Sequence, residues 1–350
     1  MRVALLLWLM LCAAARPERP AGSRKPLTFN LGPVVLRPSG FFDYIAEYRS
    51  ATTLDTISTN FGGIPLRTTP GETLASPGHS LLSLKAETSL AGGTLAGYFE
   101  ADFLDKPGYQ CYRSRQYWGE YSRSGWRVLA GQAWSLLRPN RKGISTESGL
   151  MNTQAVDPAY HVGLAGVRKP QVRITRVMGN WTAALAYEYR QGGDVLLKLA
   201  RDSRLMHVEA VGLGGHHGRK GASLAAVVHA GPRVDLVSQQ LWSQGGGPDV
   251  LGCLPRGVHA HATIQGVEAK VLPTLEVFSY GGLVYGTRSA GNRTVRQWSA
   301  GFRQKLFTQA GYGAAYLMGQ YSQLDRALWS GPRGAMNFVM LGFRYYMPPQ

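Results

Sequence analysis

The sequence feature that most constrains the fold is a two-residue alternation of apolar and polar residues along most of the chain. In GFFDYIAEYRS, Phe42, Tyr44 and Tyr48 share one face of an extended strand, whereas Asp43 and Glu47 share the other. The same alternation recurs in blocks of about ten residues, separated by Gly, Pro, Asn, Asp or Ser. The pattern predicts an all-β chain in which each strand has an apolar face and a face that carries charge.

Counting these blocks gives about sixteen strands. We place them near 40–50, 80–90, 94–103, 111–121, 126–135, 169–177, 181–190, 195–201, 204–212, 221–230, 234–243, 258–271, 275–286, 295–306, 311–322 and 336–347. Short turns alternate with longer loops, and the longer loops are expected at about 50–80, 136–168, 244–257 and 323–335. Short turns on one rim and long loops on the other are typical of outer-membrane barrels, and a barrel of this size encloses a water-filled lumen. We therefore predict a single transmembrane antiparallel β-barrel over 36–350, with short periplasmic turns and long extracellular loops.

The N-terminus, MRVALLLWLMLCAAARPERP, predicts export. Arg2 supplies the positive charge of a secretory signal, residues 3–12 form its apolar core, and residues 13–15 give a small-residue cleavage site. The core is too short for a spanning helix, and no run of about 18 apolar residues follows it. We expect a signal peptide at 1–15 and a short periplasmic lead-in at 16–35.

The charge of the chain first suggests a nucleic acid or an acidic surface as partner. Lys and Arg number 38 against 21 Asp and Glu, which gives a formal net charge of +17. Charged residues nevertheless make up only 17% of the chain, below the roughly 25% of ordinary globular proteins. We expect no nucleic-acid partner, and an exported protein that binds nucleic acid is the third-ranked alternative.

Patterns for catalysis or metal binding are weak. The GLGGHHG segment at 212–218 resembles a Gly-rich phosphate loop but lacks the strand–helix context, and His216 and His217 have no third ligand at a useful spacing. Nothing marks a serine partner for the other histidines. Export would leave Cys111 and Cys253, whose pairing in a disulfide the sequence leaves open. We therefore expect no enzyme, no metal site and no cofactor.

In a pore, function comes from the charged groups at the narrowest point. The loop at about 136–168 follows the fifth strand, the position of the loop that folds into the lumen of porin barrels. The candidate pore-lining residues are Arg113, Arg115, Arg127, Gln132, Arg138, Arg141, Lys142, Arg173, Asp43, Glu47, Glu100 and Asp102. Facing rows of arginine and carboxylate would create a transverse field, and a planar guanidinium binds carboxylate or phosphate with two hydrogen bonds. Two alternatives stay open: the arginines pair with the carboxylates and hold the barrel open, or the loop cluster lies on the outer surface, where it could bind lipopolysaccharide.

Several segments, taken in order, resemble a known family. FFDYIAEY, YFEADF, YRSRQYW, GQAWSLLRPN, QAVDPAYHVGLAGVRKPQVR and GFRYYMP are similar to segments of the DcaP-type trimeric porins of Gram-negative outer membranes, including the acidobacterial porin-like members. The similarity runs from about 38 to 348. It implies a sixteen-stranded barrel in the outer membrane, a homotrimer, and diffusion of small, preferably anionic solutes such as dicarboxylates. It also implies that Arg113, Arg115 and Arg173 line the pore.

One strand does not follow the alternation. If Arg113 and Arg115 both point into the lumen, a strict two-residue period turns Glu120 toward lipid, unless a bulge shifts the register. The sequence leaves the register of that strand undecided. We predict a passive outer-membrane porin with a cationic constriction. The alternative is a non-transporting barrel or adhesin that binds ligands through its extracellular loops.

Overall fold

The computed structural model describes residues 27–53, 56–106, 109–189, 192–252, 257–288, 291–309 and 311–348. The predicted signal peptide (1–15), most of the lead-in (16–35) and Cys253 lie outside the described residues. Regular structure in the described residues is almost entirely β-strand. No described helix has the length and apolar character needed to cross a membrane.

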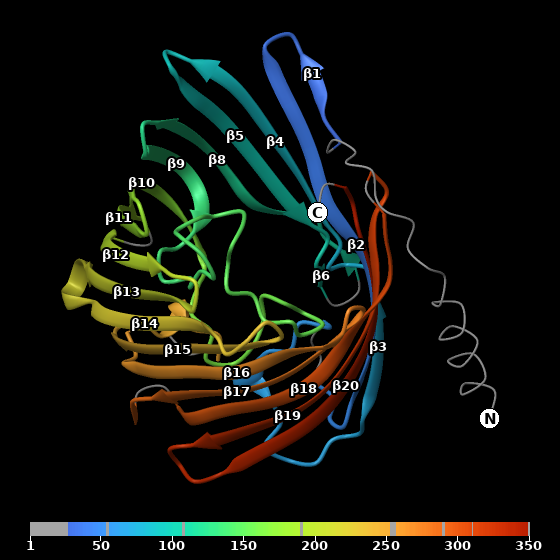
Figure 1. The fold of residues 1–350 in the computed structure, drawn as a ribbon. Helices are drawn as coiled ribbons and strands as arrows, with labels where there is room; N and C mark the ends of the chain where they lie inside the picture. Colours follow the sequence, from blue (N-terminus) through green and yellow to red (C-terminus); the bar gives the residue numbers. More distant parts are fainter. Residues whose placement is uncertain are drawn as a thin grey trace.

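Sixteen of the described strands form one closed antiparallel barrel (Figure 1). They are β2 (Val34–Arg49), β4 (Leu81–Leu90), β5 (Gly93–Asp102), β8 (Arg113–Arg123), β9 (Trp126–Trp134), β10 (Arg168–Met178), β11 (Trp181–Glu188), β12 (Asp194–Asp202), β13 (Met206–Gly215), β14 (Lys220–His229), β15 (Val234–Gln244), β16 (Ala260–Leu272), β17 (Leu275–Gly286), β18 (Asn292–Gln309), β19 (Gly313–Leu328) and β20 (Arg333–Tyr346). Each pairs with the next, and the pairing of β2 with β20 closes the ring. The predicted barrel and its strand order are confirmed.

Short elements complete the described structure. The strand β1 (Phe29–Leu31) pairs with the start of β2, and β3 (Glu72–Ser76) pairs with its end. A separate two-stranded ribbon joins β6 (Asp105–Lys106) to β7 (Tyr109–Gln110). Three single 3₁₀ turns follow the chain order as η1 (Phe61–Gly63), η2 (His216–Gly218) and η3 (Gly247–Asp249).

The alternation of the sequence separates the two faces of the barrel wall. In β12, Val195, Leu197 and Leu199 are exposed on the outer face, whereas Leu196 and Lys198 are fully buried on the inner face. An outer face of exposed leucine, valine and aromatic side chains suits lipid, because in water such a surface would be unfavourable. The same pattern holds in β2 and β20, where outward aromatic and aliphatic side chains alternate with buried ones.

Short turns and long connections lie at opposite rims, as predicted. Two-residue turns join β4 to β5 and β8 to β9, whereas residues 135–167 join β9 to β10. The expected long loop at 323–335 is wrong, because β19 continues to Leu328 and β20 starts at Arg333. These strand ends are covered by the loop that follows β2: Arg326 donates to the Gly62 carbonyl at 2.5 Å. Packing against this loop therefore accompanies strands that are longer than the alternation of apolar residues predicts.

A β-bulge resolves the irregular strand. The register between β5 and β8 shifts after Glu100, which pairs with Gln116, whereas Ala101 pairs with Ser114. Arg115 is thus the extra residue of the bulge, and its side chain reaches the same inner face as Arg113. Beyond the bulge, Glu120 pairs across to the buried Leu129 and therefore faces inward.

Candidate functional site

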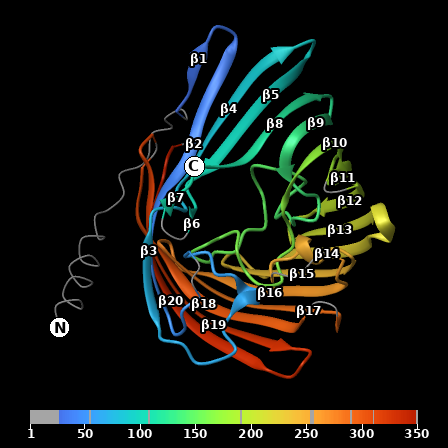
Figure 2. The same cartoon turned by 180° about the vertical axis from the view of Figure 1, so that it is seen from behind.

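The connection between β9 and β10, residues 135–167, runs through the interior of the barrel (Figures 1 and 2). Many of its residues are buried, including Leu136, Ile144, Val156 and Val162. We call this segment the inserted loop. It lies against the inner wall from β11 to β20. The wall of β4, β5, β8 and β9 largely borders open space, although Lys85 pairs with Glu147 of the loop and Arg127 donates to the Ile144 carbonyl.

Polar side chains of the wall bind the backbone of the inserted loop. Seven of its amide N–H groups donate to inward side chains: Leu136 to Glu188, Asn140 to Glu209, Gly143 to Asp202, Gln154 to Tyr280, Val156 to Gln320, Val162 to Gln297, and Ala165 to Gln239. Donor–acceptor distances run from 2.6 Å for Gln154 to 3.2 Å for Gly143. A buried amide without a partner is costly, so this set of acceptors fixes where the loop lies.

A buried charge cluster anchors the start of the inserted loop. The Lys198 ammonium group lies 2.8 Å from Glu209 and donates to the Arg138 carbonyl at 2.8 Å and to Asn140 Oδ1 at 2.9 Å. His207 contacts Glu209 at 3.1 Å and Asp202 at 2.8 Å through its two ring nitrogens. Because these groups are buried, removing any one of them would leave a buried charge or polar group without its partner, which destabilises the fold.

The loop cations predicted for the pore are largely engaged with protein groups. Arg138 is 1% exposed, donates to Asn152 Oδ1 at 2.5 Å and stacks 5.0 Å from the Trp134 ring, and burial lowers its pKa to about 9. Arg141 forms an ion pair with Glu268 of the wall, and this carboxylate raises the pKa of Arg141 although burial opposes it. Lys142 is exposed.

The inserted loop touches strand backbone directly near its C-terminal end. Gly163 has a φ of +85°, and a Cβ there would lie 2.0 Å from the Thr263 carbonyl oxygen. A Cβ on Gly282 of β17 would lie 1.9 Å from the Val162 carbonyl oxygen. Any side chain at either position would push the loop away from the wall, so both glycines are required by this close approach.

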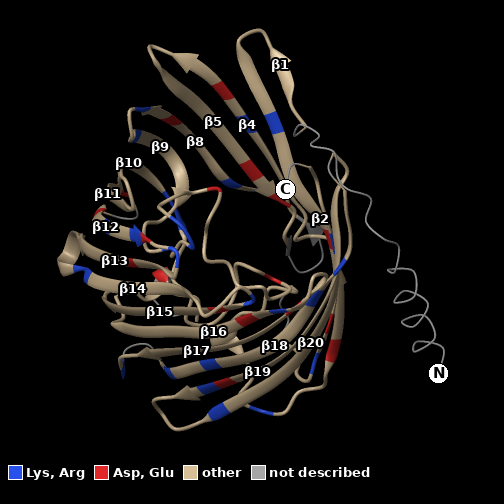
Figure 3. Ribbon diagram, viewed as in Figure 1, with Lys and Arg blue, Asp and Glu red and all other residues tan. Residues whose placement is uncertain are grey.

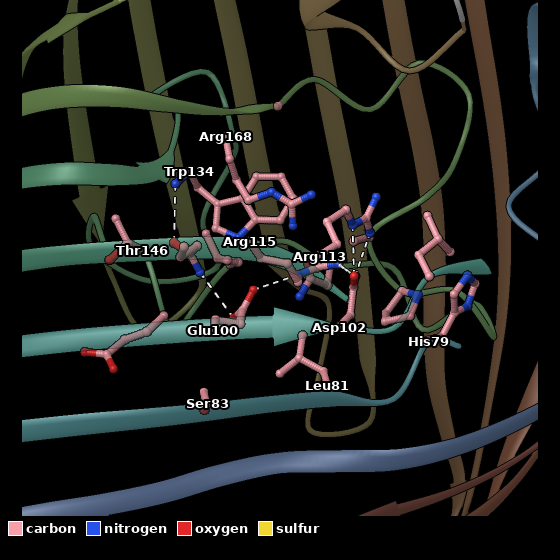
Figure 4. A pocket seen from close by; sticks show the side chains of 18 of the residues that line it. His79, Leu81, Ser83, Glu100, Asp102, Arg113, Arg115, Trp134, Thr146 and Arg168 are labelled. Carbon is pink, nitrogen blue, oxygen red and sulfur yellow. Dashed lines mark hydrogen bonds and ion pairs between the residues drawn. The ribbon is translucent and has the colours of Figure 1, made fainter. Parts of the chain in front are cut away.

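The open space beside the loop is a cavity of about 930 Å³. Its walls come from β2, β4, β5, β8, β9, the start of β10 and the inserted loop. Figure 4 shows its side chains, with Glu100, Asp102, Arg113 and Arg115 on one side and Arg168 above them. The cavity is thus eccentric, because the loop occupies much of the rest of the barrel interior (Figure 1).

Arginine and carboxylate side chains pair on one wall of this cavity. Arg113 contacts Asp102 through two hydrogen bonds of 2.9 and 2.6 Å, and Arg115 contacts Glu100 at 2.7 Å and also Asp102. The facing rows predicted from the sequence are therefore replaced by pairs between the neighbouring strands β5 and β8. In the first pair the Arg113 side chain is 40% exposed and Asp102 only 2%. The cation faces the channel and the carboxylate lies behind it.

Arg168 is a cation of the cavity wall that no sequence pattern singles out. It begins β10, lines the cavity, and stacks 4.8 Å from the Trp134 ring. Its Nη1 is buried without a hydrogen-bond partner, and no described carboxylate forms an ion pair with it. It is the register partner of Trp134, so the exit and return of the inserted loop bring the two together. Aligning β9 with β10 in the sequence places Arg168 next to Trp134, and this alignment could have predicted that Arg168 lines the cavity.

The other predicted pore residues have different places. Arg173 is buried and donates to Gln171 and to the Trp134 carbonyl, and Arg127 donates to the Ile144 carbonyl at 2.6 Å. Asp43 accepts from Arg344 across the β2–β20 closure at 2.9 Å, and Glu47 pairs with Arg49 at 2.8 Å. None of these four predicted residues lines the 930 Å³ cavity, whereas Gln132 does and donates to the Arg115 carbonyl at 2.9 Å.

Among the residues that the structure describes, no group of three or more His, Cys, Asp or Glu side chains could hold a metal ion. The rings of His216 and His217 lie 4.0 Å apart within η2. The preceding glycines of the GLGGHHG segment belong to the strand β13.

Comparison with known proteins places this geometry in a fold. No protein-family model and no curated protein sequence matches the chain. Among solved structures, the outer membrane channel DcaP of Acinetobacter baumannii aligns with a TM-score of 0.73 at 16% identity, covering 90% of this chain and 97% of that one. An anion-selective porin from Comamonas acidovorans gives 0.62 at 14% identity, covering 90% and 100%. The trimer form of OmpT from Vibrio cholerae gives 0.60 at 11% identity, covering 90% and 100%. The chain therefore has the fold of the outer-membrane porins, and the resemblance seen in its sequence segments is confirmed at the level of the fold.

Proposed function

We propose that this chain is a porin of the bacterial outer membrane, through which small solutes diffuse passively with a preference for anions. One observation carries the preference: in the Arg113–Asp102 pair at the cavity, the cation is exposed and its counter-charge is withdrawn. Asp102 lies behind Arg113, and Arg168 has no described carboxylate partner. A cleft lined by cations concentrates anions and excludes cations of similar size.

The cations also suit solutes with two acidic groups. Arg113, Arg115 and Arg168 border the same cavity from β8 and β10 (Figure 4). Guanidinium groups bind carboxylates through paired hydrogen bonds, so a small dicarboxylate can contact both strands at once. This arrangement supports dicarboxylates as the solute class, consistent with the sequence resemblance.

Planar-bilayer reversal potentials in a salt gradient test the proposal. The wild-type channel should be anion-selective, and replacing Arg113 and Arg115 together with Gln should lower or invert the selectivity, because Glu100 and Asp102 then lose their cations. Arg176→Gln, at the turn-side rim, is the matched control and should leave selectivity unchanged. Cation selectivity of the wild type would refute the anion preference, and absence of conductance would favour an adhesin.

We also propose that the chain is exported by residues 1–15, that 36–350 form the barrel, and that the barrel assembles as a homotrimer within outer-membrane lipid and lipopolysaccharide. The signal-like N-terminus supports the first point, and the trimer form of the OmpT neighbour supports the last. Unheated gel electrophoresis and the mass of the detergent-solubilised protein check the trimer. A monomer under mild extraction would contradict it.

A further inference from the structure

The outer face of β11 to β15 has a hollow that channel function does not use. It has a volume of about 370 Å³, and its lining includes Trp181, Leu199, Leu224, Ala210, Ala226 and Ser238. The first three are bulky and exposed, with Leu224 at 62%, and form its sides. Ala210 and the register partners Ala226 and Ser238 form a floor of small side chains between them. We call this hollow the outer groove.

The outer groove begins at a cation near one rim of the barrel. Arg201 lies at the end of β12, lines the groove, and is the register partner of Trp181, with its guanidinium carbon 5.4 Å from the ring centroid. No described side chain forms an ion pair with Arg201. The turn from β12 to β13, residues 203–205, places this end at the rim of short turns, which is periplasmic in outer-membrane barrels.

A second cation–aromatic pair on the same rim provides a comparison. Arg176 and Trp126 are register partners of β10 and β9, with 4.9 Å between the guanidinium carbon and the ring centroid. Arg176, however, donates to the Ser124 carbonyl at 2.6 Å, whereas no hydrogen bond is found for Arg201 among the described residues. Of these two arginines, Arg201 is therefore the one whose guanidinium can bind an acceptor from outside the protein.

We propose that the outer groove binds one anionic phospholipid of the periplasmic leaflet. Its phosphate would pair with Arg201, since a guanidinium binds phosphate with two parallel hydrogen bonds. Trp181 lies at the depth where tryptophan is enriched in membranes, between headgroup and acyl chain. One acyl chain would lie over Ala210, Ala226 and Ser238, where small side chains leave room between Trp181 and Leu224. A second hollow of about 450 Å³ starts at the same Ala226 and Ser238 and leads toward Trp298, which extends the apolar path.

This site rests on the membrane location of the barrel and not on solute passage, so the two proposals fail separately. Native mass spectrometry of the detergent-solubilised full chain, mixed with phosphatidylglycerol or phosphatidylcholine, counts the retained lipid. We expect phosphatidylglycerol to be retained in preference to phosphatidylcholine. Arg201→Gln should lower that retention about fivefold, the effect of one cation at a charged membrane surface.

Two matched variants make the test specific. Arg176→Gln removes the other rim cation and should leave retention unchanged. Ala226→Leu fills the floor of the groove and should lower retention, whereas Ala183→Leu, on the outer strand surface outside the groove, should not. Unheated-gel mobility equal to that of the wild type would show that each variant is folded. Equal retention of the two lipids, or equal retention by wild type, Arg201→Gln and Ala226→Leu, would overturn the proposal.

Discussion

Two parts of the inner wall have the same alternating sequence and opposite surroundings. On β5 and β8, inward Glu100, Asp102 and Arg113 border the open cavity. From β13 to β19, inward Glu209, Gln239, Gln297 and Gln320 bind the inserted loop instead. Figure 3 marks the charged positions along the strands and draws the glutamines tan. An inward polar residue in a barrel therefore does not by itself indicate contact with water. Where the lumen is filled, the same residue type serves as an acceptor for a buried backbone.

The largest effect is expected from the charge cluster that anchors the inserted loop to the filled part of the wall. Lys198→Met leaves the buried Glu209 with only His207 beside it and removes the donor to the Arg138 carbonyl, so the free energy of unfolding should fall by about 3–5 kcal/mol. Unfolding followed by unheated-gel mobility in urea measures it. Lys220→Met, at an exposed strand end, is the control and should cost far less. A loss below about 1 kcal/mol would show that the cluster does not hold the loop.

The loop should also respond to pH through His161. Its ring is fully buried, and burial lowers its pKa from 6.5 to about 4. A histidine with a depressed pKa stabilises the folded state fully above the unfolded pKa, and this stability is lost as pH falls from about 6.5 toward about 4, up to about 3 kcal/mol in total.

Conductance noise and unfolding stability compared at pH 7 and pH 5 measure this dependence. The channel should be less stable and noisier at pH 5, and His161→Gln should remove that difference. An equal pH response in wild type and variant would assign the effect to other groups.

Single acceptors of the wall should have smaller effects. Gln297→Leu removes the partner of the buried Val162 amide, which lies 3.0 Å from Gln297 Oε1, and should lower stability by about 1–3 kcal/mol. Gln323→Leu is the matched outward glutamine on β19 and should be neutral or slightly stabilising, because that position faces lipid. Equal losses from the two substitutions would contradict the role assigned to the inner acceptor.

The smallest change in free energy is expected from substitutions of two arginines of β10, but the two substitutions should differ clearly in their effect on selectivity. Arg168→Gln should reduce the anion-to-cation permeability ratio about twofold to threefold, a difference under 1 kcal/mol. Arg173→Gln should leave the ratio unchanged, because Arg173 is buried behind the Trp134 carbonyl. Reversal potentials in the same bilayer compare them. A change in selectivity from Arg173→Gln alone would reverse the assignment of lining and buried positions.

The residues of the cavity wall were partly predictable, because some of them follow from the residue pattern within a single strand. Arg113 and Arg115 were expected at the pore, and both border the cavity. Their order along the strand suggested a bulge, since strict alternation would have turned Glu120 outward; the bulge lies at Arg115. Arg168 was missed because its role depends on the register between β9 and β10, set after a connection of 33 intervening residues, 135–167. Such a long-range pairing leaves no mark in the pattern of a single strand.

The sequence by itself determined that this chain forms a barrel of about sixteen strands and, outside the bulged strand β8, which residues turn outward. Side-chain direction in a strand follows a period of two, and lipid accepts only one kind of face. Only the tertiary structure decided which inward residues meet the channel. The path of residues 135–167 covers one part of the wall and leaves another open, and that path follows from seven amide contacts to seven different strands or strand ends. Those contacts join residues up to 164 positions apart, so no local pattern encodes them.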